Sequence, residues 1–355
     1  MDTTWLGKLG RLLKGERAGV AAVAAIMLTV MVGMIGAVVD LGLLYATKNE
    51  LQNAADAAAL AGASTLVTYD QDRNVMAQPD VAITTAQQVA LANQALGVNL
   101  QLRLEDITLG LWVEPDKDFD PDHIGPSSDP NYLSACRVVV RRDNIANSPV
   151  NTIFAGAVGF SVVNVTALST AELGYAGSAG DGMVDLPVAI KEEVLNSGNG
   201  PICGETIYFH DENDENAEWT SFFTSPSNDP NVRDYVDGTL SVPALQVGDE
   251  VNVINGNLST HTFDALADRF QSEGTDLDGD GNADAWQVLL PVIGGTSSGA
   301  SSATIVGFAH LIITEVRNAP YKEITGVLQC GLVVPGSTTG GGNFGSRATT
   351  PKLVE

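Results

Sequence analysis

The chain has 355 residues, of which 43 are acidic and 18 are basic, and its formal net charge is −25. A surface this acidic repels polyanions, which argues against nucleic acid and anionic lipid as partners. The length allows two or three domains, since a domain typically takes about 100–200 residues. We therefore expect an acidic, multidomain protein that does not act on nucleic acid.

The first element is an uncharged apolar run from Ala18 to Val39. As a helix it would extend roughly 33 Å, enough to cross the hydrocarbon core of a bilayer. A soluble helix of this length would need a polar face, and residues 18–39 include no acidic or basic side chain. A cleaved signal peptide is the alternative, but the run is longer than a signal core and no A-x-A site ends it. We predict a transmembrane helix over residues 18–39.

Charges beside the span predict its orientation. The leader, residues 1–17, carries four basic and two acidic residues. Because positive flanks stay in the cytoplasm, we expect a single pass through the inner membrane, with the bulk of the chain periplasmic or extracellular. Asp40 lies at the outer end of the span, where an acid either serves a function or simply meets headgroup water.

Residues 40–68 are predicted to continue the helix as a stalk. Small side chains recur on it at helical spacing, among them Ala55, Ala58 and Gly62. Such a stripe lets another backbone approach closely. It therefore predicts helix packing, together with Asp40, and self-association. The alternative is a stiff rod, because alanine is the best helix former.

We expect residues 79–175 to form a small α+β unit outside the membrane. Pro79 opens a helix, and alternating apolar residues over Leu100–Val113 predict two strands. Ser148 has the signature of an N-cap followed by proline, which predicts a short helix ending at Gly159. Helices and strands of this kind, mixed along the chain, indicate an α+β fold class.

The second half of the chain reads as β-rich. The stretch Ala176–Gly182 has the composition of a linker. Short apolar runs separated by turn residues then predict a sandwich or a barrel over residues 183–334, with a helix over Phe263–Phe270. Residues 335–355 are rich in glycine, serine and threonine, and we expect them to form a flexible, disordered tail.

The chain has three cysteines. In an oxidising compartment one pair is expected to form a disulfide. Cys136 lies in an apolar run and is interpreted as a buried thiol, so Cys203 and Cys330 are the candidate pair. No C-x-x-C motif occurs, and we expect no metal or redox chemistry from the thiols.

The strongest chemical signal is an acidic loop over residues 276–287. Its oxygen-bearing side chains follow the spacing of a calcium-binding loop; they are Asp276, Asp278, Asp280, Asn282 and Asp284. Gly281 permits the sharp turn, but Gln287 stands where an EF-hand has a bidentate glutamate. We expect calcium here; the alternative is a solvated acidic turn without an ion. A similar run over residues 116–122 has proline in place of glycine, and we interpret it as a solvated loop.

No motif requires catalysis. A G-x-S-x-G pattern occurs at Gly295, Ser297 and Gly299, but a nucleophile elbow needs a following helix, and here an apolar strand pattern follows. The four histidines show no metal-binding spacing. We therefore predict that the protein is not an enzyme.

A family resemblance rests on the first part of the chain. The leader ending GER-G, the apolar span and the string VDLGLLYATKNELQNAADAAALAGA resemble the N-terminal region of TadG-like proteins of the tight-adherence (Flp) pilus system. The resemblance covers Glu16–Leu66, and VNTIFAGAVGFSVVNVTALSTAEL and the ending PKLVE are also similar to short family members. The D-x-S-x-S motif of the von Willebrand A domain found in many TadG proteins is absent, so the chain resembles a short form.

The resemblance implies a structural or assembly role in a Tad-type pilus and secretion apparatus. It also implies other Tad components in the envelope as partners, and no catalysis. A second hypothesis keeps the same anchor but makes the exported part a calcium-stabilised surface adhesion module.

Overall fold

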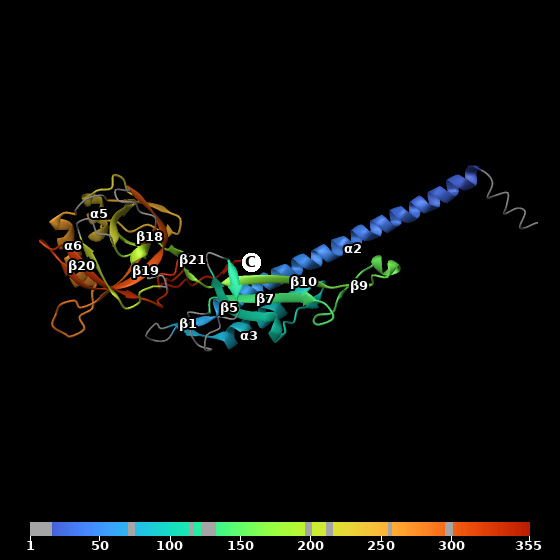
Figure 1. Cartoon of the computed structure of the whole chain (residues 1–355), viewed down its shortest axis with the longest axis horizontal. Helices are drawn as coiled ribbons and strands as arrows, with labels where there is room; N and C mark the ends of the chain where they lie inside the picture. The colour runs from blue at the N-terminus through green and yellow to red at the C-terminus, as the bar shows by residue number, and fades with distance from the viewer. Residues whose placement is uncertain are drawn as a thin grey trace, which may run out of the picture. The chain divides into compact units, whose positions relative to one another are not determined.

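The protein is described by a computed structural model that covers residues 16–69, 75–113, 117–121, 133–195, 201–210, 216–254, 258–294 and 301–355. It is a mixed α+β fold with a long apolar helix at its N-terminal end (Figure 1). Two compact units divide the chain, and each contains three segments. The first unit comprises Met1–Ala58, Ala86–Ile107 and Val138–Ser169, and the second comprises Ala59–Thr85, Thr108–Arg137 and Thr170–Glu355. The boundaries expected at residues 79–175 and 183–334 differ from this division, because segments distant in sequence pair with one another.

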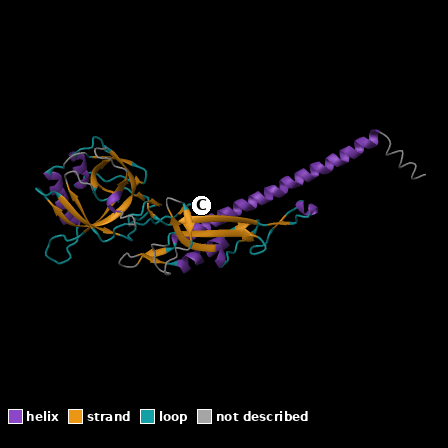
Figure 2. Cartoon of the chain, viewed as in Figure 1, coloured by secondary structure: helices purple, strands orange, loops and turns teal. Residues whose placement is uncertain are grey.

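Helix α2 (Glu16–Ser64) is continuous through the predicted span and most of the predicted stalk, and Figure 2 shows it as the longest helix drawn. Its first half exposes apolar side chains; Ile26 and Met34 are 66% and 65% exposed. Among the described residues, one helix, Gly19–Ser64, is long and apolar enough to cross a membrane. The helix fits a single-pass membrane anchor, and it ends at Ser64 rather than at residue 68.

The second half of α2 is packed within the chain. The fully buried side chains on its face are small or aliphatic: Leu51, Ala54, Ala55, Ala58, Ala59 and Ala63. Gly62 is buried as well. Helix α3 (Pro79–Leu91) buries an alanine face of the same kind, with Ala82, Ala86 and Ala90 fully covered. The small side chains expected to pack against another backbone are therefore covered within the chain itself.

Enlarging a residue of this buried stripe should destabilise the chain. In the Ala58→Leu variant, the extra carbons enter a packed interior, which typically costs about 1–3 kcal/mol. Ala46→Leu is the matched control, because Ala46 lies on the same helix but is exposed. Urea-induced unfolding of the detergent-solubilised chain measures both; equal stability of the two variants would show that the stripe is not packed.

A five-stranded sheet has the strand order β22-β10-β7-β5-β6. Helix α2 lies along β10 (Figure 1): Lys48 Nζ donates to Thr166 O over 2.6 Å, and Gln52 Nε2 donates to Leu168 O over 2.9 Å. The strands of the sheet are β5 (Ile107–Val113), β6 (Asp118–Asp120), β7 (Ala135–Arg142), β10 (Val165–Glu172) and β22 (Lys352–Leu353).

Shorter elements surround this sheet. The alternation over Leu100–Val113 predicted two strands, but the structure has only β5 there, preceded by a 3₁₀ helix, η1 (Leu104–Asp106). The predicted helix after Ser148 is also shorter than expected, since only a 3₁₀ turn ends at Gly159. The other elements before residue 175 are β1 (Val67–Tyr69), β2 (Val75–Ala77), β3 (Gln94–Ala95), β4 (Val98–Asn99), β8 (Val150–Asn151), η3 (Ala155–Val158) and β9 (Val162–Val163).

The β-rich part of the second unit is a closed barrel. A seven-stranded sheet, ordered β14-β20-β19-β17-β15-β13-β18, gains a further pairing between β19 and β18 that closes five of its strands. The closure depends on β19, whose 16 residues pair with β17 at one end and with β18 along the middle. The barrel strands are β13 (Val188–Lys191), β15 (Ala217–Phe222), β17 (Glu250–Val253), β18 (Trp286–Gly294) and β19 (Ser302–Arg317).

Aromatic side chains contribute to one of the buried clusters of the barrel part. Phe263 and Phe270 of α6 belong to the same buried cluster as Trp219 and Trp286 of the strands. The rings of Trp219 and Phe263 meet edge to face at 5.7 Å. The predicted helix over Phe263–Phe270 thus lies within α6. The remaining elements are β11 (Tyr175–Ala176), β12 (Ser178–Ala179), α4 (Glu192–Leu195), β14 (Thr206–His210), α5 (Asp229–Val236), β16 (Leu245–Gln246), α6 (Thr260–Glu273), β20 (Glu323–Gln329) and β21 (Thr339–Gly341).

The expected linker and the expected disordered tail are both wrong. Strands β11 and β12 lie in the linker stretch, and they pair with β21 and β16. Within residues 335–355, β21 and β22 pair with earlier strands, and Ser346 and Ala348 are fully buried. Small residues here permit close backbone approach, because a Cβ on Gly341 would collide with the carbonyl oxygen of Ala176. The composition that predicted flexibility instead allows tight pairing.

Candidate functional site

The outer end of the apolar helix holds a distant loop of the same chain. Asp40 Oδ1 accepts the backbone N–H of Ile153 at 2.7 Å, and Oδ2 accepts those of Phe154 at 3.0 Å and Ala155 at 2.6 Å. The side chain is almost covered, since Asp40 is 4% exposed. One carboxylate thus binds three consecutive amides, and hydrogen bonds to a charged acceptor are the stronger kind.

The three amides belong to the tip of a hairpin that we call the 150–163 hairpin. Its strands are β8 and β9, which pair Val150 with Val163. The 3₁₀ helix η3 forms the tip, and Asp40 accepts N–H groups that have no partner within that turn. Sequence reasoning singled out Asp40 but missed these partners, because a backbone amide 113 residues away leaves no mark in the residue pattern.

The hairpin packs against the helix at a glycine, Gly36. Gly36 lies one turn before Asp40 and is buried, although its neighbours on the helix are exposed. A Cβ added at Gly36 would lie 2.7 Å from Cβ of Phe154, whereas one added at Gly33 or Gly42 would have nothing within 4 Å. The Phe154 side chain therefore covers the helix backbone at Gly36.

Arg142 holds the base of the same hairpin. Its Nε donates to the carbonyl oxygens of Asn147 and Ser148, both at 3.0 Å, and its Nη1 donates to Ala95 O at 2.9 Å. Burial lowers the pKa of the Arg142 guanidinium, and the nearby charge of Glu50 opposes that shift. Nothing in the residue pattern singles out Arg142, because its partners are again backbone atoms.

The acidic loop brings together three of its five predicted ligands. Oxygen atoms of Asp276, Asp278 and Asp284 all lie within 4.8 Å of one another. Asp276 accepts the N–H groups of Gly281 and Gly279, which lower the pKa of its carboxyl, so the group is ionised as a cation ligand must be.

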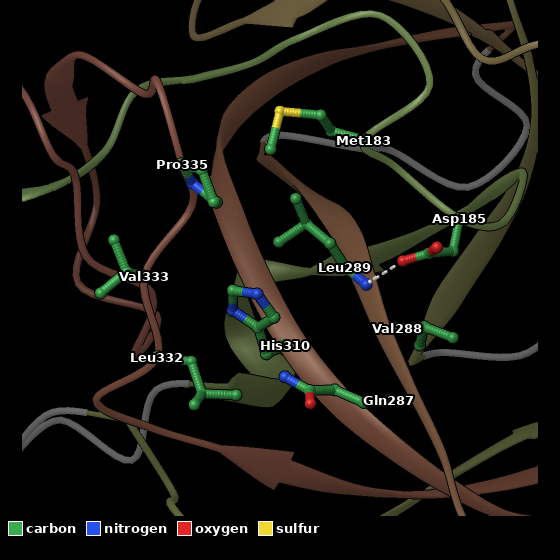
Figure 3. Close-up of a pocket in the computed structure, with 9 residues that line it drawn as sticks. All are labelled: Met183, Asp185, Gln287, Val288, Leu289, His310, Leu332, Val333 and Pro335. Carbon is green, nitrogen blue, oxygen red and sulfur yellow. Dashed lines mark hydrogen bonds between the residues drawn. The ribbon is translucent and has the colours of Figure 1, made fainter. Parts of the chain in front are cut away.

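Asp280, a fourth predicted ligand, does not belong to this cluster. Asp280 accepts the backbone N–H of Asn282 at 2.8 Å, which occupies one of its carboxylate oxygens. Gln287 lies on β18, is exposed, and lines a pocket beside that strand (Figure 3). In the second acidic run, Asp118 and Asp120 belong to β6, and Asp116 and Asp122 lie outside the described residues.

A disulfide joins Cys203 to Cys330, with their Cα atoms 5.6 Å apart. Cys330 directly follows β20, and Cys203 precedes β14, which pairs with β20. Cys136 is a buried free thiol, and burial raises its pKa to about 12. A thiol with such a pKa stays protonated and unreactive at neutral pH.

A pocket of about 540 Å³ lies beside β18 and β19, and segments before β13 and after β20 complete its lining (Figure 3). Two titratable side chains are among its described lining residues, Asp185 and His310. Asp185 accepts the N–H of Leu289 at 2.6 Å, and burial raises the pKa of its carboxyl. His310 Nδ1 lies 2.7 Å from the hydroxyl of Ser346. Ser346 is fully buried and does not line the cavity, so the described lining residues include no hydroxyl or thiol nucleophile. The predicted G-x-S-x-G positions, Gly295, Ser297 and Gly299, lie outside the described residues.

Two known families match the long apolar helix and the part of the chain that follows it. The Flp pilus-assembly TadE/G-like family matches residues 19–65, and the Tad-like Flp pilus-assembly family matches residues 44–171. Both sides of the Asp40 contact fall within these matches. No curated protein and no solved structure matches the chain. The two family matches, which together span residues 19–171, support a TadG-like protein of the Tad (Flp) pilus-assembly type.

Proposed function

We propose that this protein is a non-catalytic, membrane-anchored structural component of a Tad-type pilus and secretion apparatus. The observation that carries the proposal is the pair of family matches over residues 19–171, which include the anchor helix and the loop that Asp40 binds. Helix α2 would fix the chain in the inner membrane, and the remainder would meet other Tad components in the envelope.

Two features support an exported location for the bulk of the chain. The leader is positive, and positive flanks stay in the cytoplasm. The pairing of Cys203 with Cys330 suits an oxidising compartment, since disulfides persist outside the cytoplasm. The barrel would then stand on the far side of the membrane from the leader.

In-cell crosslinking followed by isolation of the tagged chain tests the proposal. Mass spectrometry should find Tad secretion and pilin components enriched over a control isolation with an unrelated single-pass protein. Recovery of the chain without any Tad component would refute the assembly role. Carbonate extraction of the same membranes should leave the chain in the pellet, as expected for an anchor.

A second function, calcium-stabilised surface adhesion, is favoured by the convergence of Asp276, Asp278 and Asp284. The two functions differ in where the barrel is accessible. Protease added to intact cells would cleave a surface adhesin, whereas a component at the inner membrane would be cleaved only after the outer barrier is opened.

We further propose that the acidic loop binds calcium, and we expect calcium to stabilise the barrel. A cation that binds only the folded state adds about 2.7 kcal/mol at a concentration of about 100 times its Kd. Asp278→Asn should abolish the rise in the melting temperature, because Asp278 belongs to the convergent cluster. Asp280→Asn is the matched control and should retain most of the rise. An unchanged melting temperature of the native chain in calcium would exclude the site.

A further inference from the structure

The tip of the 150–163 hairpin is apolar and exposed. Ile153 is 64% exposed, Val158 75% and Phe160 67%. The chain has no charged residue between Asp143 and Glu172, although 17% of its residues are charged. A contiguous exposed apolar surface marks a site of interaction with another apolar phase.

The hairpin lies beside the apolar part of α2. Phe154 covers Gly36, which belongs to the uncharged run that must lie in hydrocarbon if the helix crosses a membrane. At 1.5 Å per residue, Gly36 is about 6 Å along the helix from Asp40 toward the N-terminus. Figure 1 shows the hairpin extending from β9 along α2 in that same direction. The exposed apolar surface of the hairpin tip therefore lies at the same height along the axis of α2 as the exposed apolar surface of the helix.

We propose that the 150–163 hairpin inserts into the outer leaflet of the membrane, beside Asp40. The helix and the hairpin would then both anchor the chain. This inference rests on the proposed membrane anchoring by α2. The apolar surface of the tip continues the exposed apolar surface of the helix, and a bilayer covers both surfaces at once. The uncharged tip needs no anionic lipid, which agrees with the acidity of the chain.

The hydrogen bonds of the hairpin suit a dry environment. A backbone polar group in hydrocarbon must be satisfied within the protein. Asp40 accepts the amides of residues 153–155. Within the hairpin, Thr152 N donates to Ser161 O, and Phe160 N donates to Ala155 O, both at 3.0 Å. Asp40 thus accepts the backbone hydrogen bonds that water would accept in a solvent-exposed turn.

Site-specific fluorescence in vesicles tests the proposal. The full chain is reconstituted in phosphatidylcholine vesicles, and a polarity-sensitive dye is attached at Val158→Cys, Ile26→Cys or Leu277→Cys. Cys136 is buried and the other native cysteines are paired, so the introduced thiol reacts selectively. Ile26, 66% exposed on α2, reports lipid, and Leu277, 71% exposed in the acidic loop, reports water.

Brominated lipid should quench the dye at Val158→Cys about as strongly as at Ile26→Cys, and should not quench it at Leu277→Cys. Adding phosphatidylglycerol should not change this order. Quenching at Ile26→Cys without quenching at Val158→Cys would overturn the hairpin proposal and leave the anchor intact. Loss of quenching at Ile26→Cys would overturn the anchor itself. The dye at Val158→Cys could instead report an apolar environment that brominated lipid does not quench and that strengthens as protein density rises. That result would overturn insertion into lipid and assign the surface to contact with a second copy of the chain.

Discussion

Replacing Asp40 with alanine should release the 150–163 hairpin from α2. The variant removes the carboxylate that accepts three consecutive amides, at residues 153–155, in the described part of the chain. Hydrogen exchange should show these amides falling to the protection of a frayed loop, with an opening free energy near zero. The barrel amides should keep their native protection, because they do not depend on this contact.

Two further variants make the Asp40 experiment specific. Asp40→Asn keeps one side-chain oxygen as an acceptor, and its hairpin protection should be intermediate. Asp56→Ala is the matched control on the same helix, since Asp56 accepts a side-chain bond from Gln52 at 2.8 Å. Native protection of residues 153–155 in Asp40→Ala would show that the carboxylate does not hold the hairpin.

Removing the disulfide should be the most damaging change to the barrel. The bond between Cys203 and Cys330 closes a loop with a sequence separation of 127 residues. Cross-linking a loop of this length restricts the unfolded chain, and its loss typically lowers the free energy of unfolding by about 2–5 kcal/mol. The double variant Cys203→Ser, Cys330→Ser should therefore unfold at a clearly lower temperature than the native chain.

Reduction gives an independent check on the same bond. Dithiothreitol should destabilise the native chain and a Cys136→Ala variant alike, and it should not affect the double variant. A native chain whose melting temperature is insensitive to reduction would contradict the structural importance of the disulfide.

The sequence identified the elements whose signal is local. An uncharged run of this length predicts a membrane helix, and α2 fits that expectation. Short apolar runs with turn residues between them predicted a sandwich or a barrel, and the structure is a barrel. The choice between the two could not be made from the sequence. Closure depends on the parallel pairing of β13 with β18, which joins Ile190 to Val292 across a long sequence separation.

Predictions from amino-acid composition failed where small residues allow close packing. The Gly/Ser/Thr-rich C-terminal residues predicted a disordered tail, yet they approach other strands closely at Gly341. The alanine stripe of α2 predicted a surface for another chain, yet Ala55 and Ala58 are covered within this one. Small side chains indicate close approach, but they do not indicate which partner approaches.

In the candidate sites too, residue spacing identified the residues but not their partners in space. Spacing alone selected the acidic loop, and three of its carboxylates converge. Spacing could not place Gln287, which lies on a strand of the barrel. For Asp40, the position at the end of the span marked the residue, while its amide partners could be found only from the fold.

Counting pili on cells that lack this protein tests the assembly role most directly. The deletion strain should still make the pilin but should lose surface Flp pili, and the native chain supplied in trans should restore them. The Asp40→Ala chain should restore fewer pili than the Asp56→Ala chain, if the anchored hairpin matters for assembly. Normal numbers of pili in the deletion strain would contradict a structural role in the Tad apparatus.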